Sequence, residues 1–345
     1  MAGFETCKGG FQLKTMTETL VIALGGNAIT RPGESGAIPL QFAHTAETLE
    51  HLKPLFHSGS RIAITHGSGP QIGNILIRVE EGERRVPHLP LDTCDADCQG
   101  GMGYMIQRLA CELFRREGIK REAATLITQV LVDRDDPDFQ HPTKPIGSIY
   151  DANQLAGIRS DRPDWIMREV SPGAYRRVVP SPRPLRILEA EAISSLLDAG
   201  VVVIACGGGG IPVAWEDDRL VGVEAVVDKD LASSMLATHV RARKLIIVTS
   251  VDRVALDYGR PSQHWLDSIT MDQARQHLAA GQFPPGSMGP KIQAAIDFLE
   301  HGGEECIITS VENVANAVIG NGGTHIVAPW RRTSLDFAEV REGAG

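Results

Sequence analysis

Short apolar runs rich in β-branched residues alternate with stretches of helical apolar spacing along most of this chain. The apolar runs predict strands at residues 20–24, 61–65, 123–132, 201–205, 245–249 and 306–309, with an edge strand at 324–327. The helical spacing predicts helices at residues 41–57, 71–81, 99–117, 187–197, 229–238, 271–280 and 291–301, with a short one near 311–319. Strands that alternate with helices favour an α/β fold with a mostly parallel sheet covered by helices on both faces.

The alternation stops between Asp133 and Pro184, where the sequence is rich in Pro, Asp and Arg and shows little periodicity. A long irregular insertion inside a compact domain is usually either functional or disordered. Short apolar patches at Gly147–Tyr150 and Tyr175–Val179 favour an ordered structure. We therefore expect a small protruding subdomain or lid at about 133–184.

Three of the apolar runs end abruptly in a glycine turn, within Leu20–Ile29, Arg61–Gly73 and Val201–Pro212. A glycine turn at the carboxyl end of a buried strand lets backbone N–H groups approach a ligand closely, and a helix that begins there favours an anion. Three such turns indicate one anionic site where several strands end. None of them spells a P-loop or G-x-G-x-x-G, so the positive charge must come from elsewhere in the chain.

Composition excludes several classes of protein. The 345 residues are 42% hydrophobic and 22% charged, which is ordinary for a globular chain that buries a large core. The formal net charge of −9, without a basic run, disfavours nucleic-acid binding. No apolar stretch reaches the length of a membrane span, and residues 1–18 lack the apolar core of a signal peptide. We expect a disordered or non-native leader at 1–18 and a cytoplasmic location.

The six cysteines are scattered along the chain. Cys94 and Cys98 have C-x-x-x-C spacing, but no second pair or nearby histidine completes a zinc site. Buried free thiols are the favoured interpretation, and we expect no metal ligand from the protein.

Three lysines occupy settings that suit an anion site. Lys144 stands in PTKPIG, where two prolines restrict the backbone. Lys229 lies between Asp228 and Asp230 at a predicted helix start, and Lys291 follows GSMGP at another. A lysine at the positive end of a helix gains nothing from the dipole, so a bound polyanion would account for it. The alternatives are a solvated loop lysine for the first and simple helix capping by the two aspartates.

The turns themselves allow two interpretations. Asn27 follows two glycines and is suited either to cap a helix or to present its amide to a substrate oxygen. Ser68 lies in HGSGPQ, which is not the G-x-S-x-G of a hydrolase, so an anion-binding turn is favoured over a nucleophile. His66 is more consistent with packing or hydrogen bonding than with a base. Phosphoryl transfer suits this set, because it needs positioning, donors and cations more than a general base.

Ten segments, in order along residues 19–330, make the chain resemble the carbamate kinases of the amino-acid kinase family. They are LVIALGGNAI (20–29), HGSGPQIGN (66–74), LDTCDADCQGGMGY (91–104), TQVLVD (128–133), PTKPIG (142–147), RRVVPSPRP (176–184), ACGGGGIPV (205–213), GVEAVVDKDLAS (222–233), VTSVDRV (248–254) and GSMGPKIQAAI (286–296). PTKPIG and VVPSPRP are the most specific, because they separate carbamate kinases from other members of the larger family.

The resemblance implies transfer of a phosphoryl group between carbamoyl phosphate and ADP, giving ATP and carbamate, with Mg²⁺ carried by the nucleotide. It also implies an open three-layer α/β/α sandwich, a homodimer, an N-terminal substrate lobe at 19–225 with the protruding subdomain, and a nucleotide lobe at 226–345. The implied catalytic residues are Lys144, Lys229, Lys291 and Asp228, the last orienting the lysines. The implied substrate contacts are Gly25, Gly26, Asn27, Gly67, Ser68 and Gly69. The implied nucleotide contacts are Gly209, Ser250, Asp252, Val254, Tyr258 and Met288.

Some positions depart from the family pattern. Ser250 stands where relatives often have Asp or Gly, and Asp97 and Cys98 replace residues of a commoner TQG form.

The alternatives to a carbamate kinase are a kinase for another small carboxylate, a nucleotide-binding regulatory relative that has lost catalysis, and a Rossmann dehydrogenase. The presence of all three lysines disfavours the second, and the missing dinucleotide fingerprint disfavours the third. Breakdown of arginine or of allantoin is a possible source of carbamoyl phosphate.

Overall fold

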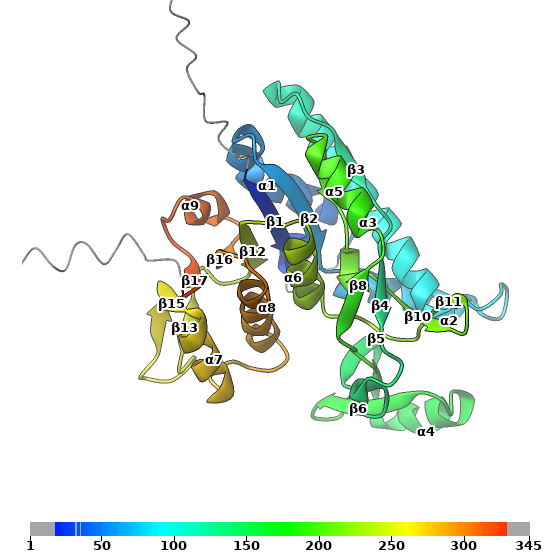
Figure 1. Ribbon diagram of the computed structural model, residues 1–345. Helices are drawn as coiled ribbons and strands as arrows, with labels where there is room; N and C mark the ends of the chain where they lie inside the picture. Colours follow the sequence, from blue (N-terminus) through cyan, green and yellow to red (C-terminus); the bar gives the residue numbers. More distant parts are fainter. Residues whose placement is uncertain (1–17, 32, 35, 330–345) are drawn as a thin grey trace, which may run out of the picture.

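An open eight-stranded sheet forms the centre of the molecule, in the order β15-β17-β16-β12-β1-β2-β9-β3 (Figure 1). The computed structural model describes residues 18–31, 33–34 and 36–329, so the leader predicted at 1–18 lies outside the described residues except for its last position. The strands of this sheet are β1 (Thr19–Leu24), β2 (Arg61–His66), β3 (Ala123–Thr125), β9 (Val202–Ile204), β12 (Lys244–Thr249), β15 (Ser268–Thr270), β16 (Glu305–Ser310) and β17 (Thr324–Val327). Neighbouring strands are parallel except for the pair β16 and β17.

Helices cover both faces of this sheet. One layer contains α1 (Ile38–His57), α2 (Gly69–Gly82), α3 (Leu91–Glu117) and α9 (Val314–Val318). The other contains α5 (Ala190–Asp198), α6 (Lys229–His239), α7 (Met271–Ala279) and α8 (Met288–Glu300). Alternate side chains of β1 serve the two layers: Leu20 and Ile22 belong to the core with α1 and α3, whereas Val21 and Ala23 belong to the core with α6 and α8. The predicted three-layer α/β/α sandwich is therefore confirmed.

Three smaller sheets are attached to this centre. The first has the order β11-β10-β4-β8, the second is the hairpin β13-β14, and the third has the order β5-β7-β6. Their strands are β4 (Gln129–Val132), β5 (Lys144–Asp151), β6 (Ile166–Ser171), β7 (Ala174–Val179), β8 (Pro184–Ile187), β10 (Ile211–Glu216), β11 (Arg219–Gly222), β13 (Val254–Leu256) and β14 (His264–Leu266). One-turn helices occur at η1 (Gly26–Ala28), η2 (Pro137–Phe139) and η3 (Gly207–Gly209).

The third small sheet, together with α4 (Ala152–Asp161), projects from the rest of the molecule (Figure 1). Its strands are antiparallel, and the side chain of Asp151 caps α4 by accepting from the N–H groups of Asn153 and Gln154. This unit falls inside the segment predicted to protrude. We refer to residues 144–179 as the projecting unit.

The structure corrects the single strand predicted at 123–132. Residues 123–125 form β3 in the central sheet, whereas residues 129–132 form β4 in the first small sheet. The side chain of Gln99 holds the break, because its Oε1 accepts from Thr128 N–H at 2.8 Å and its Nε2 donates to Thr128 O at 3.1 Å. Apolar residues continue through the bend and no glycine or proline marks it, so the run looks like one strand in the sequence.

Three other element predictions need correction. Residues 324–327 are not at the edge, because β15 lies outside β17; β15 has only Ile269 as an apolar residue and gives no strand pattern. Ile187 ends β8 by pairing with Val130, so the following helix begins only at Ala190. The helix predicted from residue 99 begins at Leu91, since its first two turns contain acidic and small residues that hide the apolar period.

Candidate active site

The three predicted glycine turns follow β1, β2 and β9, which are adjacent parallel strands of the central sheet. Their carboxyl ends therefore meet at one edge, which is the usual place for a ligand in an open α/β sheet. β12 ends at the same edge, because it pairs in parallel with β1 on the other side. The residues that follow these four strands supply much of the candidate site.

The first two turns lie directly against each other. Gly67 N–H donates to Leu24 O at 2.9 Å, and a Cβ on Gly67 would lie 3.3 Å from Gly26 N. A Cβ on Gly25 would lie only 2.7 Å from Val248 O. A side chain at Gly25 would therefore displace the end of β12, so the close approach of the strand ends requires glycine there.

Ser68 and Gly69 join β2 to α2. The helix begins at Gly69, and the side chain of Ser68 makes no capping hydrogen bond, so the N–H groups of the first turn remain available to a ligand. Asn27 lies in η1, but its side chain lies outside the described residues. The predicted choice between helix capping and substrate contact for Asn27 therefore stays open.

The third turn has an unusual backbone conformation. Cys206, Gly208 and Gly209 have φ angles of 51°, 69° and 107°, in the region that favours glycine. A Cβ on Gly208 would lie 2.5 Å from Ser68 Oγ, so this turn packs on the second one. A Cβ on Gly209 would lie 2.1 Å from Val227 O. Gly209, predicted as a nucleotide contact, is thus buried against the backbone, whereas Gly208 faces the site.

The three lysines predicted from the sequence meet here, and two aspartates hold them. Asp230 bridges two of them: its Oδ1 is 2.8 Å from Lys229 Nζ, and its Oδ2 is 2.8 Å from Lys291 Nζ. Asp228 Oδ2 accepts from Lys144 Nζ at 3.1 Å. Asp228 was predicted to orient the lysines; in the structure it forms an ion pair with Lys144 among the three, and Asp230 forms ion pairs with the other two.

The start of α6 explains how these groups are positioned. Asp228 is the N-cap of α6 and accepts from Asp230 N–H at 2.8 Å, which places the two carboxylates on either side of Lys229. Lys229 Nζ also lies 3.4 Å from the carbonyl oxygens of Ala23 and Leu24, at the end of β1. Lysine is unfavourable at the positive end of a helix, so the aspartates offset the dipole as well as the ammonium charges.

Burial makes this charge cluster strongly coupled. Burial lowers the pKa of the Lys229 ammonium, and Lys291 lowers it further, while Asp230 counteracts both. Burial would raise the pKa of Asp230, but Lys229 and Lys291 outweigh it and lower that pKa to about 2. Three ammonium groups and two carboxylates leave an excess of one positive charge, beside the N-termini of α2, α6 and α8. The cluster is therefore suited to an anion with several oxygens.

Two hollows meet at Lys291. The smaller, of about 240 Å³, is bounded by the second and third glycine turns, Asp230 and all three lysines. The larger, of about 440 Å³, begins at the first glycine turn and extends between the end of β12 and the start of α8. Gly286, Ser287 and Lys291 line both. A group bound in one hollow can thus approach a group bound in the other.

The larger hollow contains half of the predicted nucleotide contacts. The ones that line it are Ser250, Tyr258 and Met288. Asp252 does not line it; its carboxylate accepts from Asn313 Nδ2 at 2.7 Å. Hydrogen bonds from Ser310 and Asn313 lower the pKa of Asp252. Val254 is fully buried in β13 and does not line the hollow either.

Sequence reasoning did not single out several residues that line the two hollows, among them Asp230, Gly208, Arg253 and Trp265. Asp230 was noted beside Lys229, but its bridge to Lys291 depends on the packing of α6 against α8. Gly209 was predicted in place of Gly208, because four consecutive glycines look alike in the sequence and only the packing of the turn shows which one faces the site. Arg253 and Trp265 line the larger hollow; Arg253 stands in the segment VTSVDRV but was not chosen as a contact, and Trp265 stands in no segment of the family pattern.

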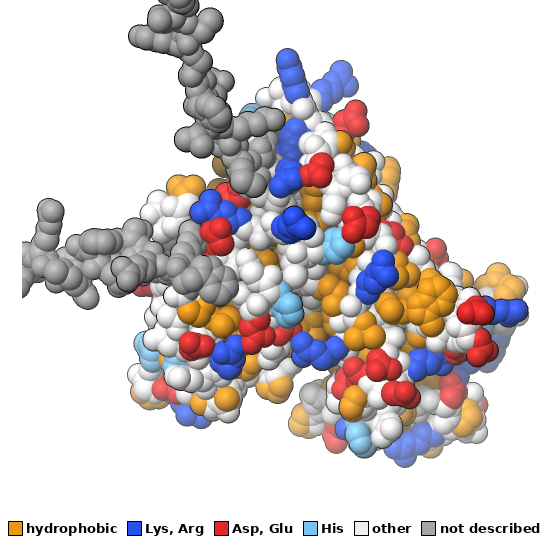
Figure 2. All heavy atoms as spheres, in the orientation of Figure 1, with side chains coloured by type: hydrophobic (Ala, Val, Ile, Leu, Met, Phe, Trp, Pro, Cys, Tyr) orange, Lys and Arg blue, Asp and Glu red, His pale blue; other side chains and the backbone are white. Residues whose placement is uncertain are grey.

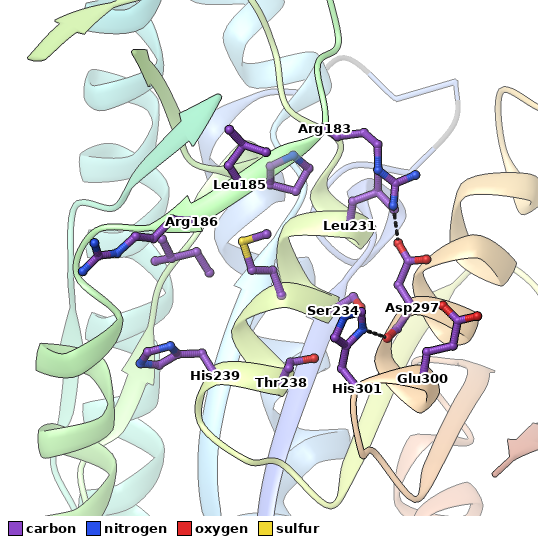
Figure 3. Close-up of a pocket in the computed structure, with 13 residues that line it drawn as sticks. Arg183, Leu185, Arg186, Leu231, Ser234, Thr238, His239, Asp297, Glu300 and His301 are labelled. Atoms are coloured by element: carbon purple, nitrogen blue, oxygen red, sulfur yellow. Dashed lines mark hydrogen bonds and ion pairs between the residues drawn. The ribbon is translucent and has the colours of Figure 1, made fainter. Parts of the chain in front are cut away.

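A third hollow, of about 480 Å³, lies between β8, α6 and α8 (Figure 3). Figure 3 shows Asp297 at its wall, where Arg183 Nη2 donates to the carboxylate at 2.7 Å and the His301 ring lies 2.7 Å from the Asp297 backbone oxygen. Leu231 and Leu185 supply apolar surface. None of the predicted site residues lines this hollow, so we separate it from the lysine cluster.

Other predicted features can be compared with the described residues. Four described cysteines are buried and free, and Cys111 is free but exposed; Cys7 lies outside the described residues. Among residues 18–329, apart from the undescribed positions, no group of three or more His, Cys, Asp or Glu side chains is arranged to hold a metal ion. No described helix is long and apolar enough to cross a membrane. Acidic and basic side chains are interspersed over the face shown in Figure 2.

Comparisons with known proteins agree with the geometry. The sequence profile of the amino acid kinase family matches residues 18–310. The carbamate kinase of Pyrococcus furiosus is 41% identical over 314 residues, which cover 90% of this chain and 100% of that protein. Carbamate kinase 2 of Staphylococcus aureus strain Mu50 is 44% identical, over 90% of this chain and 99% of that protein. The structure of carbamate kinase from Giardia lamblia bound to AMP-PNP matches with a TM-score of 0.86 and 36% identity, covering 91% of this chain and 99% of that one.

Proposed function

The chain belongs to the amino acid kinase family, among the carbamate kinases, and we propose that it transfers a phosphoryl group reversibly between carbamoyl phosphate and ADP. The products are ATP and carbamate, which decomposes to ammonia and CO₂. Carbamoyl phosphate is a mixed anhydride and carbamate is unstable, so we propose that the reaction runs mainly toward ATP.

One observation carries this proposal: three lysines from distant parts of the chain line the smaller hollow, and one of them, Lys291, also lines the larger hollow. A transferring phosphoryl group spreads negative charge over its oxygens, and fixed cations stabilise that charge. Lys291 lines both hollows, so its ammonium group can stay in contact with the phosphoryl group as that group passes from donor to acceptor. Lys229 is held beside it through Asp230, and Lys144 approaches from the projecting unit.

We assign the carbamoyl phosphate end to the smaller hollow. There the N–H groups of the turn Gly67–Gly69, which begins α2, can bind the phosphate oxygens of the donor. The turn at Gly25 and Gly26 lies at the boundary with the larger hollow. Gly26 has no heavy atom within 4 Å of the position of a Cβ, which leaves room for a substrate against its backbone.

We assign the nucleotide to the larger hollow, where Tyr258 and Met288 offer apolar surface to a base. Mg²⁺ would arrive with the nucleotide and neutralise phosphate charge. A β-phosphate oxygen of ADP attacks the phosphorus, the bond from phosphorus to the carbamoyl oxygen breaks, and that oxygen keeps the electron pair as carbamate. The attacking oxygen is already anionic, so no general base is required. His66 is not suited to that role, because burial lowers its pKa to about 4.

The organisation of the protein follows the same family relationship. We propose a substrate lobe at 19–225 and a nucleotide lobe at 226–345, a homodimer, and a cytoplasmic location. The breakdown of arginine or of allantoin would supply the carbamoyl phosphate.

The test is ATP formation from ADP and carbamoyl phosphate in the presence of Mg²⁺. We expect robust turnover by the wild type and a loss of kcat of at least about 100-fold in Lys229→Ala, which is the scale of removing a preorganised donor. The matched control is Lys120→Ala, since Lys120 is exposed in the connection between α3 and β3. Turnover with acetyl phosphate but not with carbamoyl phosphate would refute the substrate assignment.

A further inference from the structure

The first strand of the projecting unit runs along α2. Lys144, at the start of β5, shares the smaller hollow with Gly69, at the start of α2. Six residues later, Tyr150 OH donates to Glu80 Oε2 at 3.0 Å, near the end of α2. Eleven helical residues span about 16 Å and six strand residues about 20 Å, so α2 and β5 are of similar length between the shared hollow and this hydrogen bond.

Glu80 is the centre of the second contact. Its Oε2 accepts the hydrogen bond from Tyr150 OH and lies 3.5 Å from Ser148 Oγ. Its Oε1 lies 3.6 Å from the position of a Cβ on Gly147, which has a φ of 65°. The register of β5 against β7 shifts between Ile146 and Tyr150, so residues 147–149 bulge from the sheet at the place where Glu80 meets them.

The bulge is fixed from both sides. Arg176 Nη2, on the neighbouring strand β7, donates to Gly147 O at 3.0 Å, while Glu80 holds Ser148 and Tyr150 from α2. A positive-φ glycine in such a bulge sets the direction in which the preceding residues of β5 leave it. Those residues end at Lys144, whose side chain is 38% exposed and has one carboxylate contact, Asp228.

We propose that Glu80 is a positioning residue for the transfer reaction: by holding the bulge of β5 against α2, it sets where Lys144 lies in the site. The inference rests on the proposed function. Lys144 is the one lysine of the three that comes from the projecting unit, so its ammonium group is only as well placed as that unit is. The turn Gly67–Gly69 leads into the start of α2, and Glu80 lies near the end of the same helix. Glu80 therefore fixes the position of Lys144 relative to the helix that begins at the substrate turn.

Other contacts hold the projecting unit independently of Glu80. Arg162, just after α4, forms an ion pair with Glu83, and Arg177 Nη2 on β7 lies 2.8 Å from Glu224 Oε2. Loss of Glu80 should therefore leave the unit attached and folded. We expect it to shift or loosen the start of β5, which is a defect of placement and not of folding.

The first experiment compares Glu80→Ala, Tyr150→Phe and Glu80→Gln with the exposed neighbour Glu81→Gln as a control. We expect Glu80→Ala and Tyr150→Phe to lower kcat about three- to tenfold, the range of one net hydrogen bond, with the KM for ADP unchanged. Glu80→Gln should recover most of the rate, because the amide oxygen still accepts from Tyr150. The role would be refuted if the KM for ADP rose by the same factor as kcat fell. It would also be refuted if kcat were unaffected in both Glu80→Ala and Tyr150→Phe.

A double-mutant cycle separates positioning from general destabilisation. If Glu80 acts through Lys144, then Glu80→Ala should cause no further loss of kcat in a Lys144→Ala enzyme. A full additive loss in that background would show that Glu80 acts by another route and would overturn the inference.

Hydrogen exchange of the amides in residues 144–151 gives a readout that does not depend on the substrate assignment. We expect faster exchange in Glu80→Ala than in Glu81→Gln, even if the wild type proves to act on a different acyl phosphate. A wild type without carbamoyl phosphate activity would thus refute the proposed function alone, whereas unchanged exchange at 144–151 would refute the role of Glu80.

Discussion

Replacing Asp230 with Asn removes the charge that holds two lysines together. The Asp230 side chain is only 6% exposed and lies 2.8 Å from both Lys229 Nζ and Lys291 Nζ. Breaking a buried ion pair by removing one partner costs about 3–5 kcal/mol, because the remaining charge stays buried without compensation. We expect Asp230→Asn to lower the free energy of unfolding by about this amount, which is a large part of the stability of an ordinary domain.

The same substitution should change the pH dependence of the reaction. Asp230 raises the pKa of Lys229 against the effects of burial and of Lys291. Without that carboxylate, the pKa of Lys229 falls further, and the charged form is lost as the pH rises through the lower value. We therefore expect kcat to drop by at least about 100-fold near pH 8 and to recover partly at lower pH.

Urea unfolding and a pH profile of kcat test this prediction, with Asp228→Asn as the matched control. Asparagine caps a helix as well as aspartate does, so this control removes the charge beside Lys144, which is 38% exposed, and the smallest of the contributions that raise the pKa of Lys229. Its loss of stability should be about 1 kcal/mol or less. Equal stability losses in the two variants, or a wild-type pH profile in Asp230→Asn, would refute the reasoning.

Three further predictions concern other parts of the site. Burial lowers the pKa of His66 to about 4, below its value of about 6.5 in the unfolded chain, so the neutral form is favoured by folding. Stability should therefore fall by about 3 kcal/mol as the pH decreases from 6.5 to 4, and this decrease should be smaller in His66→Gln when both are measured by urea unfolding. Lys144→Ala should lower kcat, while calorimetry should show a nearly unchanged affinity for ADP. If ADP binding weakened by the same factor, Lys144 would contact the nucleotide and our assignment of it would be wrong. Gly208→Ala introduces a Cβ 2.5 Å from Ser68 Oγ at a φ of 69°. In steady-state kinetics it should raise the KM for carbamoyl phosphate more than the KM for ADP. A larger increase in the KM for ADP would contradict the assignment of carbamoyl phosphate to the smaller hollow.

The sequence points to residues that the structure gathers at the candidate site where the signal is local. Glycines that follow an apolar run mark the ends of β1, β2 and β9, and the structure brings these ends to one edge. Lys229 was identified because acidic neighbours flank it, and Lys291 because it stands at a helix start without an evident partner. Each of these signals is contained within a few residues.

The remainder depends on packing between distant segments. Asp230 and Lys291 are separated by 61 positions, so their ion pair exists only because α6 packs beside α8. The contact of Glu80 with Tyr150, 70 positions away, cannot be read from the sequence either, because it depends on the packing of α2 against β5. The break between β3 and β4 depends on Gln99, which no local pattern connects with Thr128.

The central claim is direct transfer of one phosphoryl group between two hollows that meet at Lys291. The most direct measurement is a single turnover of the wild type with Mg²⁺, ADP and carbamoyl phosphate that carries ³²P, quenched with acid at short times. We predict that the label passes from carbamoyl phosphate to the γ-phosphate of ATP without labelled protein at any time. Label that appears first on the protein, or that accumulates as inorganic phosphate with ADP unchanged, would contradict the account.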